Sequence, residues 1–329
     1  MRYLSSKVRR FSPAMCKTFL VFALLLTATH AVADDWATRL GYPEGAKVLV
    51  VHAHRMGLSF ESNEAIEKLM DAGVVSSASA MPTCPWFTAA AQWRQQRGDL
   101  DVGLDFTLNS HLPLYRWTPV SNSRDVASLV DRDGYLWQNV VQVMVNAKVD
   151  EVEQELRMQL LHADRMGLKP THFTTHLGAL YARPDLAEMY LRLSREQWIP
   201  AVVINLTPEL AERFRQDGYP VPDTLVRALD DYPFPKVRDL LILPQADSLE
   251  AKAAATAKLI AELPPGLVQL SFAPATDSPA LRAMDPSWQQ RVWDAQVWEN
   301  EAVKAELAKE DVVITNWKEI MQRFDGSVE

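Results

Sequence analysis

The regular alternation of apolar, β-rich runs with helical patterns restricts the fold of this chain more than any other feature. Such alternation is typical of βα units that build a parallel sheet. Several runs are almost continuously apolar, as expected of strands covered by helices on both faces. We expect strands at 47–51, 75–80, 102–106, 171–174, 201–204, 240–243, 267–272 and 312–314. We expect helices at 63–72, 149–166, 184–195, 247–262 and 286–309.

Seven or eight such units without a break predict an α/β fold, a distorted (β/α) TIM-like barrel in a single domain. An open doubly wound sheet is the alternative. No glycine-rich phosphate loop follows the first expected strand, which disfavours a dinucleotide-binding fold. The connection 109–148 lacks a strong periodic pattern and contains Tyr115, Arg116 and Trp117. Long connections are often functional, so we expect a lid or substrate wall here, with a packed structural excursion as the alternative.

The first 33 residues have the pattern of a signal peptide. No acidic residue precedes Asp34, an apolar run occupies 19–26, and small residues occur at Ala31 and Ala33. The apolar run is too short to span a bilayer stably, although an uncleaved anchor is the alternative. We therefore expect a leader at 1–33, a mature domain at 34–329, and a periplasmic or secreted protein.

The charge balance restricts the partners of the chain. The net charge is −8, and removal of the five basic residues of the leader would leave 29 basic against 42 acidic residues, or −13. An acidic protein is not expected to bind nucleic acid or, after leader cleavage, an anionic membrane. Cys84 would be the one remaining cysteine of the mature chain, which excludes an internal disulfide and favours a packing role for the thiol.

Polar side chains lie at the ends of three expected strands. They are His52, His54 and Arg55 after the first strand, Asp105 on the third, and His172, Thr174 and His176 on the fourth. The carboxyl ends of barrel strands meet at one mouth, where active sites of this architecture lie. We therefore expect these side chains to converge.

Two of these histidines have the spacing of a metal-binding pair. His52 and His54 point to the same side of an extended segment, and with Asp105 and His176 they could hold zinc or a similar ion. Ordinary hydrogen-bonded polar groups at strand ends are the alternative. Arg55 would repel a dication unless it turned away. Without a metal, we expect Arg55 to pair with Asp105.

Six short motifs, in the same order, resemble those of the YdjC-like/ChbG carbohydrate deacetylases. The stretch 50–59, Val-Val-His-Ala-His-Arg-Met-Gly-Leu-Ser, followed by Asn63-Glu64-Ala65-Ile66, is similar to the opening motif of that family, in which the strand ends in Ala-Asp-Asp. The further motifs lie at 73–81, 102–108, 169–176, 271–274 and 314–317. The resemblance covers about 47–320, nearly the whole expected mature chain.

The resemblance implies a distorted barrel that removes acetyl groups from N-acetylated sugars. It implies a divalent metal, zinc or magnesium, held by one Asp and two His, which polarises the amide and lowers the pKa of a bound water. A neighbouring Asp would act as general base and a second acid would protonate the leaving amine. The expected partner is an N-acetylated oligosaccharide or cell-wall saccharide, and the protein is expected to form a homodimer.

The same resemblance implies that most of the chemical positions are substituted. His54 stands at the position of the family's base, Arg55 at that of a metal-binding Asp, and Asp105 at that of a His ligand. The second His ligand is retained as His176, and Thr174 stands where the family has an Asp. The late His that precedes a proline is replaced by Ala273.

Three interpretations follow. In the first, the chain has lost deacetylation and keeps a glycan-binding site. In the second, the metal ligands are permuted to His54, Asp105 and His176, and His52 serves as base. In the third, the chain is a different barrel hydrolase. The catalytic positions are expected at His52, His54 and Thr174, and the residues expected to line the site are Arg55, His172, Tyr115, Arg116 and Trp117.

Overall fold

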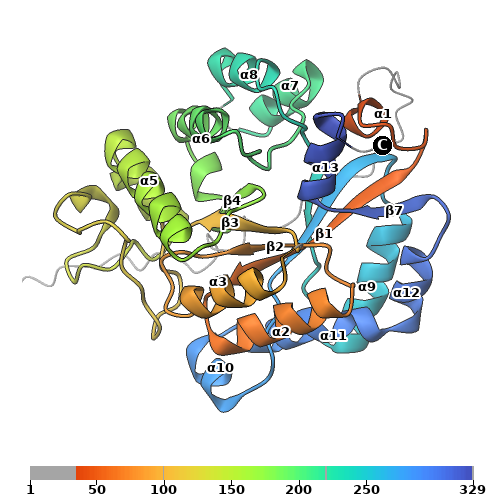
Figure 1. Cartoon of the computed structure of the whole chain (residues 1–329), viewed down its shortest axis with the longest axis horizontal. Helices are drawn as coiled ribbons and strands as arrows, with labels where there is room; N and C mark the ends of the chain where they lie inside the picture. The colour runs from red at the N-terminus through yellow and green to blue at the C-terminus, as the bar shows by residue number, and fades with distance from the viewer. Residues whose placement is uncertain (1–34, 99, 219–220, 328–329) are drawn as a thin grey trace, which may run out of the picture. The chain divides into compact units, whose positions relative to one another are not determined.

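Parallel strands form the centre of the fold (Figure 1). The structure, a computed structural model, describes residues 35–98, 100–218 and 221–327, so the predicted leader at 1–33 lies outside it. The strands in this part are β1 (Lys47–Met56), β2 (Ser77–Ala80), β3 (Val102–Phe106), β4 (Phe173–Thr175), β5 (Asp239–Ile242), β6 (Gly266–Phe272) and β7 (Val312–Thr315). Their order is β4-β3-β2-β1-β6-β5, with β7 paired to β1. The predicted parallel α/β architecture is therefore confirmed.

Strand β1 is the most connected strand of the sheet. Its first half, from Lys47 to Val50, pairs with β7, and its second half, from His52 onward, pairs with β2. Its other edge pairs with β6 from Lys47 to Ala53. Residues Val48 to Val51 have no exposed surface, as expected of a strand that is covered on both faces.

The two outer strands of the sheet are linked by an irregular segment, which curls the sheet into a distorted barrel. The backbone N–H of Val202 donates to Phe173 in β4 at 2.9 Å, and the N–H of Asn205 donates to Val237, just before β5, at 2.7 Å. We predicted a strand at 201–204, and this prediction is wrong. The segment pairs with Phe173 of β4 at Ala201 and then with Val237 at Ile204, so it forms only isolated bridges.

Helices surround the sheet, with α2 and α3 beside β1 and β2 and with α5 and α6 beside β3 and β4 (Figure 1). The helices of the described residues are α1 (Trp36–Arg39), α2 (Phe60–Asp71), α3 (Phe87–Gln96), α4 (Val140–Asn146), α5 (Val149–Arg165), α6 (Pro184–Gln197), α7 (Pro208–Gln216), α8 (Asp223–Asp230), α9 (Leu249–Ala261), α10 (Pro279–Met284), α11 (Trp288–Gln296), α12 (Glu301–Leu307) and α13 (Trp317–Phe324). Short 3₁₀ turns are η3 (Ala127–Leu129), η4 (His176–Tyr181) and η5 (Val297–Glu299). The single helix predicted at 286–309 is wrong, because Asn300 leaves the helical conformation and caps α12.

The Gly57–Asn63 segment fixes the turn between β1 and α2. Gly57 has a φ of +85°, and a Cβ there would lie 3.1 Å from the Cα of Phe87, so only glycine fits without a shift. The Asn63 side chain accepts a hydrogen bond from Gly57 N at 2.6 Å and donates one to Trp86 O at 3.1 Å. Ser59 caps α2. These motif residues therefore hold the end of β1 against the β2–α3 loop.

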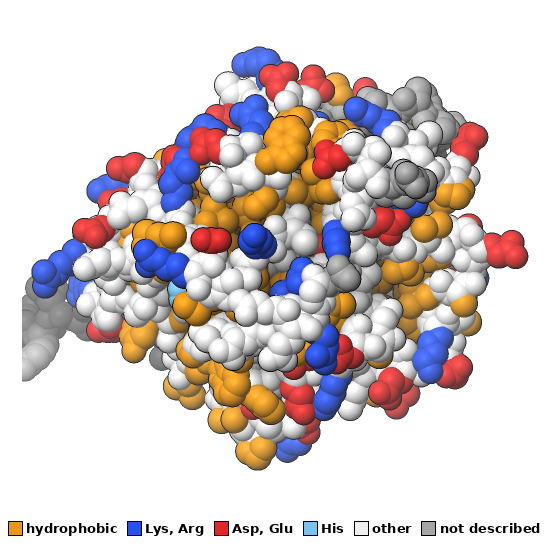
Figure 2. Space-filling view, viewed as in Figure 1, with side chains coloured by type: hydrophobic (Ala, Val, Ile, Leu, Met, Phe, Trp, Pro, Cys, Tyr) orange, Lys and Arg blue, Asp and Glu red, His pale blue; other side chains and the backbone are white. Residues whose placement is uncertain are grey.

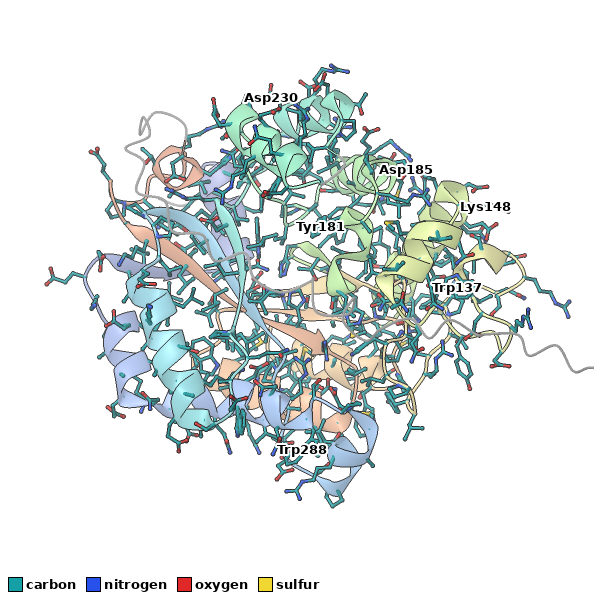
Figure 3. The ribbon with its side chains drawn as sticks, turned by 180° about the vertical axis from the view of Figure 1, so that it is seen from behind. Trp137, Lys148, Tyr181, Asp185, Asp230 and Trp288 are labelled. Atoms are coloured by element: carbon teal, nitrogen blue, oxygen red, sulfur yellow. The ribbon has the colours of Figure 1, made fainter. Side chains whose placement is uncertain are left out.

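The long connection 109–148 is a packed excursion. Its side chains Leu112, Leu129, Leu136 and Val143 are buried. The indole of Trp137 donates a hydrogen bond to Ser128 O at 2.7 Å. Figure 3 shows Trp137 within the excursion and Lys148 where it meets α5. The connection is therefore well packed, and its first residues reach the candidate site, so its role as a lid or substrate wall stays a prediction.

The surface in view mixes charges of both signs, with hydrophobic side chains in its central part (Figure 2). No continuous basic patch covers this face, which agrees with the negative net charge. None of the helices in the described ranges is long and apolar enough to cross a membrane.

Candidate functional site at the strand ends

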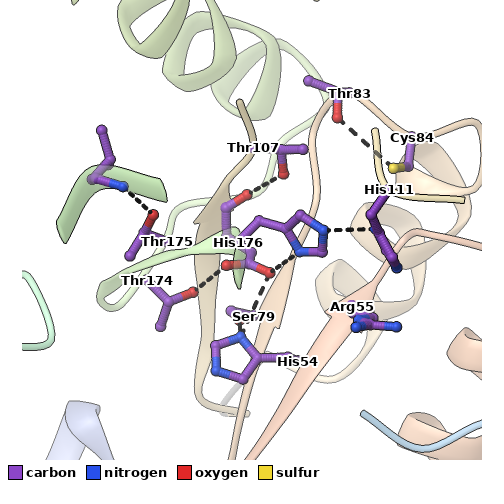
Figure 4. A network of polar contacts seen from close by, with 12 residues as sticks. His54, Arg55, Ser79, Thr83, Cys84, Thr107, His111, Thr174, Thr175 and His176 are labelled. Atoms are coloured by element: carbon purple, nitrogen blue, oxygen red, sulfur yellow. Dashed lines mark hydrogen bonds and ion pairs between the residues drawn. The ribbon is translucent and has the colours of Figure 1, made fainter. Parts of the chain in front are cut away.

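Side chains from β1, β3, β4 and η4 meet at the carboxyl end of the sheet (Figure 4). The His54 Nδ1 and His176 Nδ1 atoms lie 3.5 and 3.6 Å from Asp105 Oδ2. Thr174 Oγ1 donates a hydrogen bond to Asp105 Oδ1 at 2.8 Å. We call these four residues the strand-end cluster. Their predicted convergence is found in the structure.

Asp105 is the electrostatic centre of the strand-end cluster. Its side chain has no exposed surface, and its Oδ2 atom has no hydrogen-bond partner within the described ranges. Burial raises the pKa of a carboxyl group, but here His54 and His176 outweigh burial, so the pKa of Asp105 lies well below its usual range. Asp105 is therefore ionised at neutral pH.

His111 extends the cluster from the long excursion. Its Nδ1 lies 3.1 Å from His176 Nε2, and its ring packs edge-on against Trp117. Burial lowers the pKa of both His111 and His176, so both imidazoles are neutral near pH 7. We did not assign His111 to the site from the sequence, because only the path of the excursion brings it there.

His52 and His172 lie behind the cluster. His52 is fully buried and both its ring nitrogens contact serine hydroxyls, Ser77 at 2.9 Å and Ser79 at 3.1 Å. Burial, with His54 nearby, holds the pKa of His52 well below its usual value. His172 is also fully buried and stacks on Trp317. This arrangement supports His54 and does not favour His52 as a base in contact with a ligand.

Arg55 turns away from the strand-end cluster. Its φ of +72° is unusual for a non-glycine residue. The guanidinium lies 3.7 Å from Asp285 and is 8% exposed. The predicted pairing of Arg55 with Asp105 is therefore wrong, because the backbone aims the side chain at another carboxylate. Burial and the neighbouring Arg291 lower the pKa of Arg55 to about 9.

Asp285 belongs to a second charged cluster that the sequence did not reveal. Arg291 Nε lies 3.5 Å from Asp285, and Arg291 Nη1 lies 3.6 Å from Asp294. The carboxylate of Asp294 binds Lys252 at 2.6 Å and accepts a hydrogen bond from Ala273 N at 3.1 Å. We call Arg55, Asp285, Arg291, Asp294 and Lys252 the arginine–aspartate cluster.

The three residues expected to line the site from the excursion have different positions. Trp117 is buried and its ring lies 6.2 Å from that of His176. Tyr115 donates a hydrogen bond to Leu58 O at 2.9 Å, and burial raises its pKa to about 12. Arg116 binds Asp131 at 2.7 Å, so it holds the excursion together.

A cavity of about 540 Å³ opens between the start of α3, the excursion and α5. Its lining includes the hydroxyl groups of Thr83, Thr88 and Thr118 and the thiol of Cys84. Thr83 and Cys84 contact each other at 3.8 Å between oxygen and sulfur, as the dashed line in Figure 4 marks. Cys84 is a buried free thiol whose pKa burial raises, in agreement with a packing role. The volume suits a small ligand such as one or two sugar units.

The side chains do not fit the metal site that the motif resemblance implies. Within residues 35–98, 100–218 and 221–327, no group of three or more His, Cys, Asp or Glu side chains could hold a metal ion. The position that the resemblance assigns to a metal-binding Asp carries the buried guanidinium of Arg55. This guanidinium offers no lone pair to a metal, and although it turns away from the strand-end cluster, its charge still lowers the pKa of the buried His176 and His111.

A parallel, distorted barrel with polar groups gathered at the carboxyl ends of its strands defines the class of (β/α)-barrel proteins whose sites lie at that end. Within this class, the chain belongs to the YdjC-like protein family, whose model matches residues 48–309. This result confirms the family that the motifs indicated.

Relatives of known name agree with this assignment. A carbohydrate deacetylase of Thermus thermophilus is 32% identical over 279 residues, which cover 84% of this chain and 94% of that protein. A chitooligosaccharide deacetylase of Yersinia enterocolitica is 33% identical over 159 residues, 47% of this chain and 58% of that protein. A solved Enterococcus faecalis structure, named for proposed cellobiose-phosphate cleavage, matches with a TM-score of 0.68 at 20% identity, covering 83% of this chain and 98% of that one. That structure supports the fold.

Proposed function

We propose that this chain is an exported member of the carbohydrate deacetylase family that binds N-acetylated saccharides without metal-dependent deacetylation. Family membership supports a saccharide ligand, since the named relatives are carbohydrate and chitooligosaccharide deacetylases. The signal-peptide pattern of residues 1–33 supports export to the periplasm or beyond.

The position of Arg55 carries this proposal. A guanidinium stays protonated even where burial lowers its pKa to about 9, so it remains a cation at neutral pH. It replaces a carboxylate that the motif resemblance assigns to the metal, and its guanidinium lies 3.7 Å from Asp285. Loss of a ligand together with gain of a fixed charge disfavours the family's reaction more than either change alone.

The remaining groups suit a polyhydroxylated ligand. The Nε2 atom of His111 has no hydrogen-bond partner among the described residues, while Nδ1 of this neutral ring faces His176, so Nε2 can bind one ligand hydroxyl. Leu177 and Tyr181 follow His176 and are 48% and 42% exposed, which offers apolar surface for a sugar ring face or an acetyl methyl group. The threonine hydroxyls of the neighbouring cavity add further partners.

One observation favours a second candidate, a hydrolase with permuted metal ligands. Among the described residues, Asp105 Oδ2 has no hydrogen-bond partner, and two imidazole nitrogens, of His54 and His176, face it at 3.5 and 3.6 Å. Two nitrogens and one oxygen are a donor set that zinc accepts. In this candidate His54, Asp105 and His176 would hold the ion, and it would require a small shift of these side chains.

Metal content and acetate release separate the two candidates. Protein purified without chelator should contain no stoichiometric zinc or magnesium by elemental analysis. It should release no acetate from chitooligosaccharides, while calorimetry should detect their binding. About one metal per chain together with acetate release would support the permuted site and overturn our proposal.

A restored variant provides the matched test. Combining His54→Asp, Arg55→Asp, Asp105→His and Thr174→Asp returns the residues that the motif resemblance implies. This variant should gain one bound metal per chain if the scaffold is that of the family. A folded variant without metal would contradict the assignment of these four positions.

A further inference from the structure

The arginine–aspartate cluster contains one more cation than anions. Lys252 and Asp294 form a close buried pair at 2.6 Å, with side chains 1% and 7% exposed. Arg55 and Arg291 both face the carboxylate of Asp285, at 3.7 and 3.5 Å, and Arg291 also lies 3.6 Å from the already paired Asp294. The ionised Asp105 acts on Arg55 from beyond ion-pair distance, so the excess of positive charge is confined to the cluster itself, where a further anion would be favourable.

Two of the guanidinium nitrogens in this cluster have no hydrogen-bond partner among the described residues. They are Arg55 Nη1 and Arg291 Nε, and both are buried atoms. Both face Asp285 Oδ2 from beyond ordinary hydrogen-bond distance, while Asp285 Oδ1 is already bound by Ser287 N at 2.8 Å. A buried donor without an acceptor destabilises the fold. The two nitrogens therefore offer a place for one more acceptor oxygen.

The cluster adjoins the strand-end cluster. Arg55 directly follows His54 in the chain, and the charges of Arg55 and Arg291 both lower the pKa of His111. Arg291 is 18% exposed and Arg55 is 8% exposed, so a ligand would reach Arg291 first. The nearby carboxylate of Asp105 is already in contact with Thr174, His54 and His176.

We propose that the saccharide bound at the strand ends carries a carboxylate group, and that Arg291, with Arg55 behind it, binds this group. The inference rests on the proposed saccharide-binding function and specifies its ligand class. Guanidinium groups match the planar geometry of a carboxylate and form charge-assisted hydrogen bonds with it. A neutral acetamido group would satisfy one donor but would not balance the charge.

The test compares two forms of one ligand. Calorimetry at low salt would measure binding of fully N-acetylated chitotriose, which is neutral, and of the same trisaccharide with one primary alcohol oxidised to a carboxylate. We expect the acidic form to bind roughly tenfold more tightly, the effect of one charge-assisted hydrogen bond. Equal affinities would contradict the carboxylate inference and leave the proposed function intact. Binding of neither form would overturn the proposed function itself.

Variants locate the preference. Arg291→Gln should bring the ratio of acidic to neutral affinity close to one. The control is Arg282→Gln, which removes an arginine of α10 that is 54% exposed and pairs with Asp277. This change should leave the ratio unchanged. If Arg291→Gln does not fold, Arg291→Lys keeps the charge without the planar donors and should still reduce the ratio. An unchanged ratio in a folded Arg291 variant would contradict the assignment.

Discussion

At the scale of single residues, Asp105 organises the candidate site through contacts on both of its oxygens. One oxygen accepts from Thr174 at 2.8 Å, and the other is shared by two imidazoles. Because the carboxylate is completely buried, each of these contacts replaces water that the ionised group has lost. The hydrogen bond from Thr174 is therefore a charge-assisted bond in a dry environment.

Thr174→Val should destabilise the protein by about 1.5–3 kcal/mol, because it removes a hydrogen bond to a buried charge and keeps the shape of the side chain. The measurement is the free energy of unfolding in urea. The matched control is Thr256→Val, since the Thr256 hydroxyl is equally buried and has no partner among the described residues. That change should be neutral or stabilising. Equal losses in the two variants would show that the bond to Asp105 contributes nothing.

The site residues that could be predicted are those whose position follows from the sheet alone. His54, Asp105 and His176 lie at or just after the carboxyl ends of β1, β3 and β4, and the parallel strands of one sheet end at one edge. His111 and Asp285 lie in connections whose paths depend on side-chain packing. The direction of Arg55 depends on a left-handed backbone conformation that an arginine rarely adopts. No local pattern indicates such a conformation.

At the scale of elements, the connections at the carboxyl end of the sheet carry most of the specific geometry. The β1–α2 turn is tied to the β2–α3 loop through the two hydrogen bonds of Asn63. The turn also requires close backbone approach at Gly57, where the Cα of Phe87 and the carbonyl of Met81 leave no room for a Cβ. The position of Arg55, two residues earlier, depends on this turn.

Gly57→Ala should destabilise the protein by clearly more than Gly73→Ala. Both glycines have positive φ, +85° and +69°, so both substitutions incur a left-handed penalty of about 1–2 kcal/mol. Only at Gly57 does the added methyl group meet backbone atoms, at 3.1 and 3.3 Å, whereas nothing lies within 4 Å at Gly73. The difference between the midpoint shifts of the two variants measures the cost of the close contact at Gly57. Equal midpoint shifts would contradict the close approach.

Helices α5 and α6 are joined by a network of surface ion pairs. Hydrogen bonds from Arg192 and Arg157 lower the pKa of Glu153 to about 2 from a usual value of 4.5. A lowered pKa means that the ionised form stabilises the fold above about pH 4.5 and that this contribution disappears as the pH falls toward 2. Because the network lies at the surface, the contribution is about 1 kcal/mol at most.

Glu153→Gln should therefore lower the free energy of unfolding at pH 7 and lose this effect progressively below pH 4.5. Urea titrations at several pH values provide the measurement. Glu188→Gln, on α6 but outside the network, is the control and should show no such pH dependence. A Glu153 effect that persists unchanged at low pH would exclude an electrostatic origin.

The strands and most of the longer helices could be predicted because their apolar periods are long and regular. The prediction failed where the apolar pattern continues but the backbone leaves the helical or extended conformation. Apolar residues continue through 286–309, yet Asn300 interrupts the helix there. The residues at 201–204 are typical of a strand, but the segment pairs first with Phe173 and then with Val237, so no continuous ladder of hydrogen bonds forms. Both failures reflect tertiary contacts that override a local preference.

At the scale of the whole molecule, the chain retains the scaffold of its family. The family model covers residues 48–309, and the barrel core residues of β1 and β6 are almost completely buried. The stability of such a core does not require an ion, because hydrophobic burial supplies the main driving force. The whole protein should therefore respond little to metal removal.

Chelator treatment should leave the thermal midpoint unchanged, as should subsequent addition of zinc. A metal that binds the folded chain and is present at 100 times its dissociation constant would stabilise it by about 2.7 kcal/mol. Scanning fluorimetry with and without EDTA resolves an effect of this size. The Thermus thermophilus relative can serve as a parallel sample. A midpoint that falls with EDTA and recovers with zinc would favour the permuted site.

Two non-glycine residues with a positive φ angle directly follow the histidines of the strand-end cluster. Arg55 follows His54 with φ +72°, and Leu177 follows His176 with φ +51°. Such conformations persist only while surrounding contacts enforce them. The backbone at the carboxyl end of the sheet thus holds two unfavourable conformations, which depend on the contacts around them. Under mildly destabilising conditions, this end of the sheet should open before the rest of the fold. Amide hydrogens at 54–58 and 176–180 should then exchange with deuterium sooner than those at 47–51, in the first half of β1.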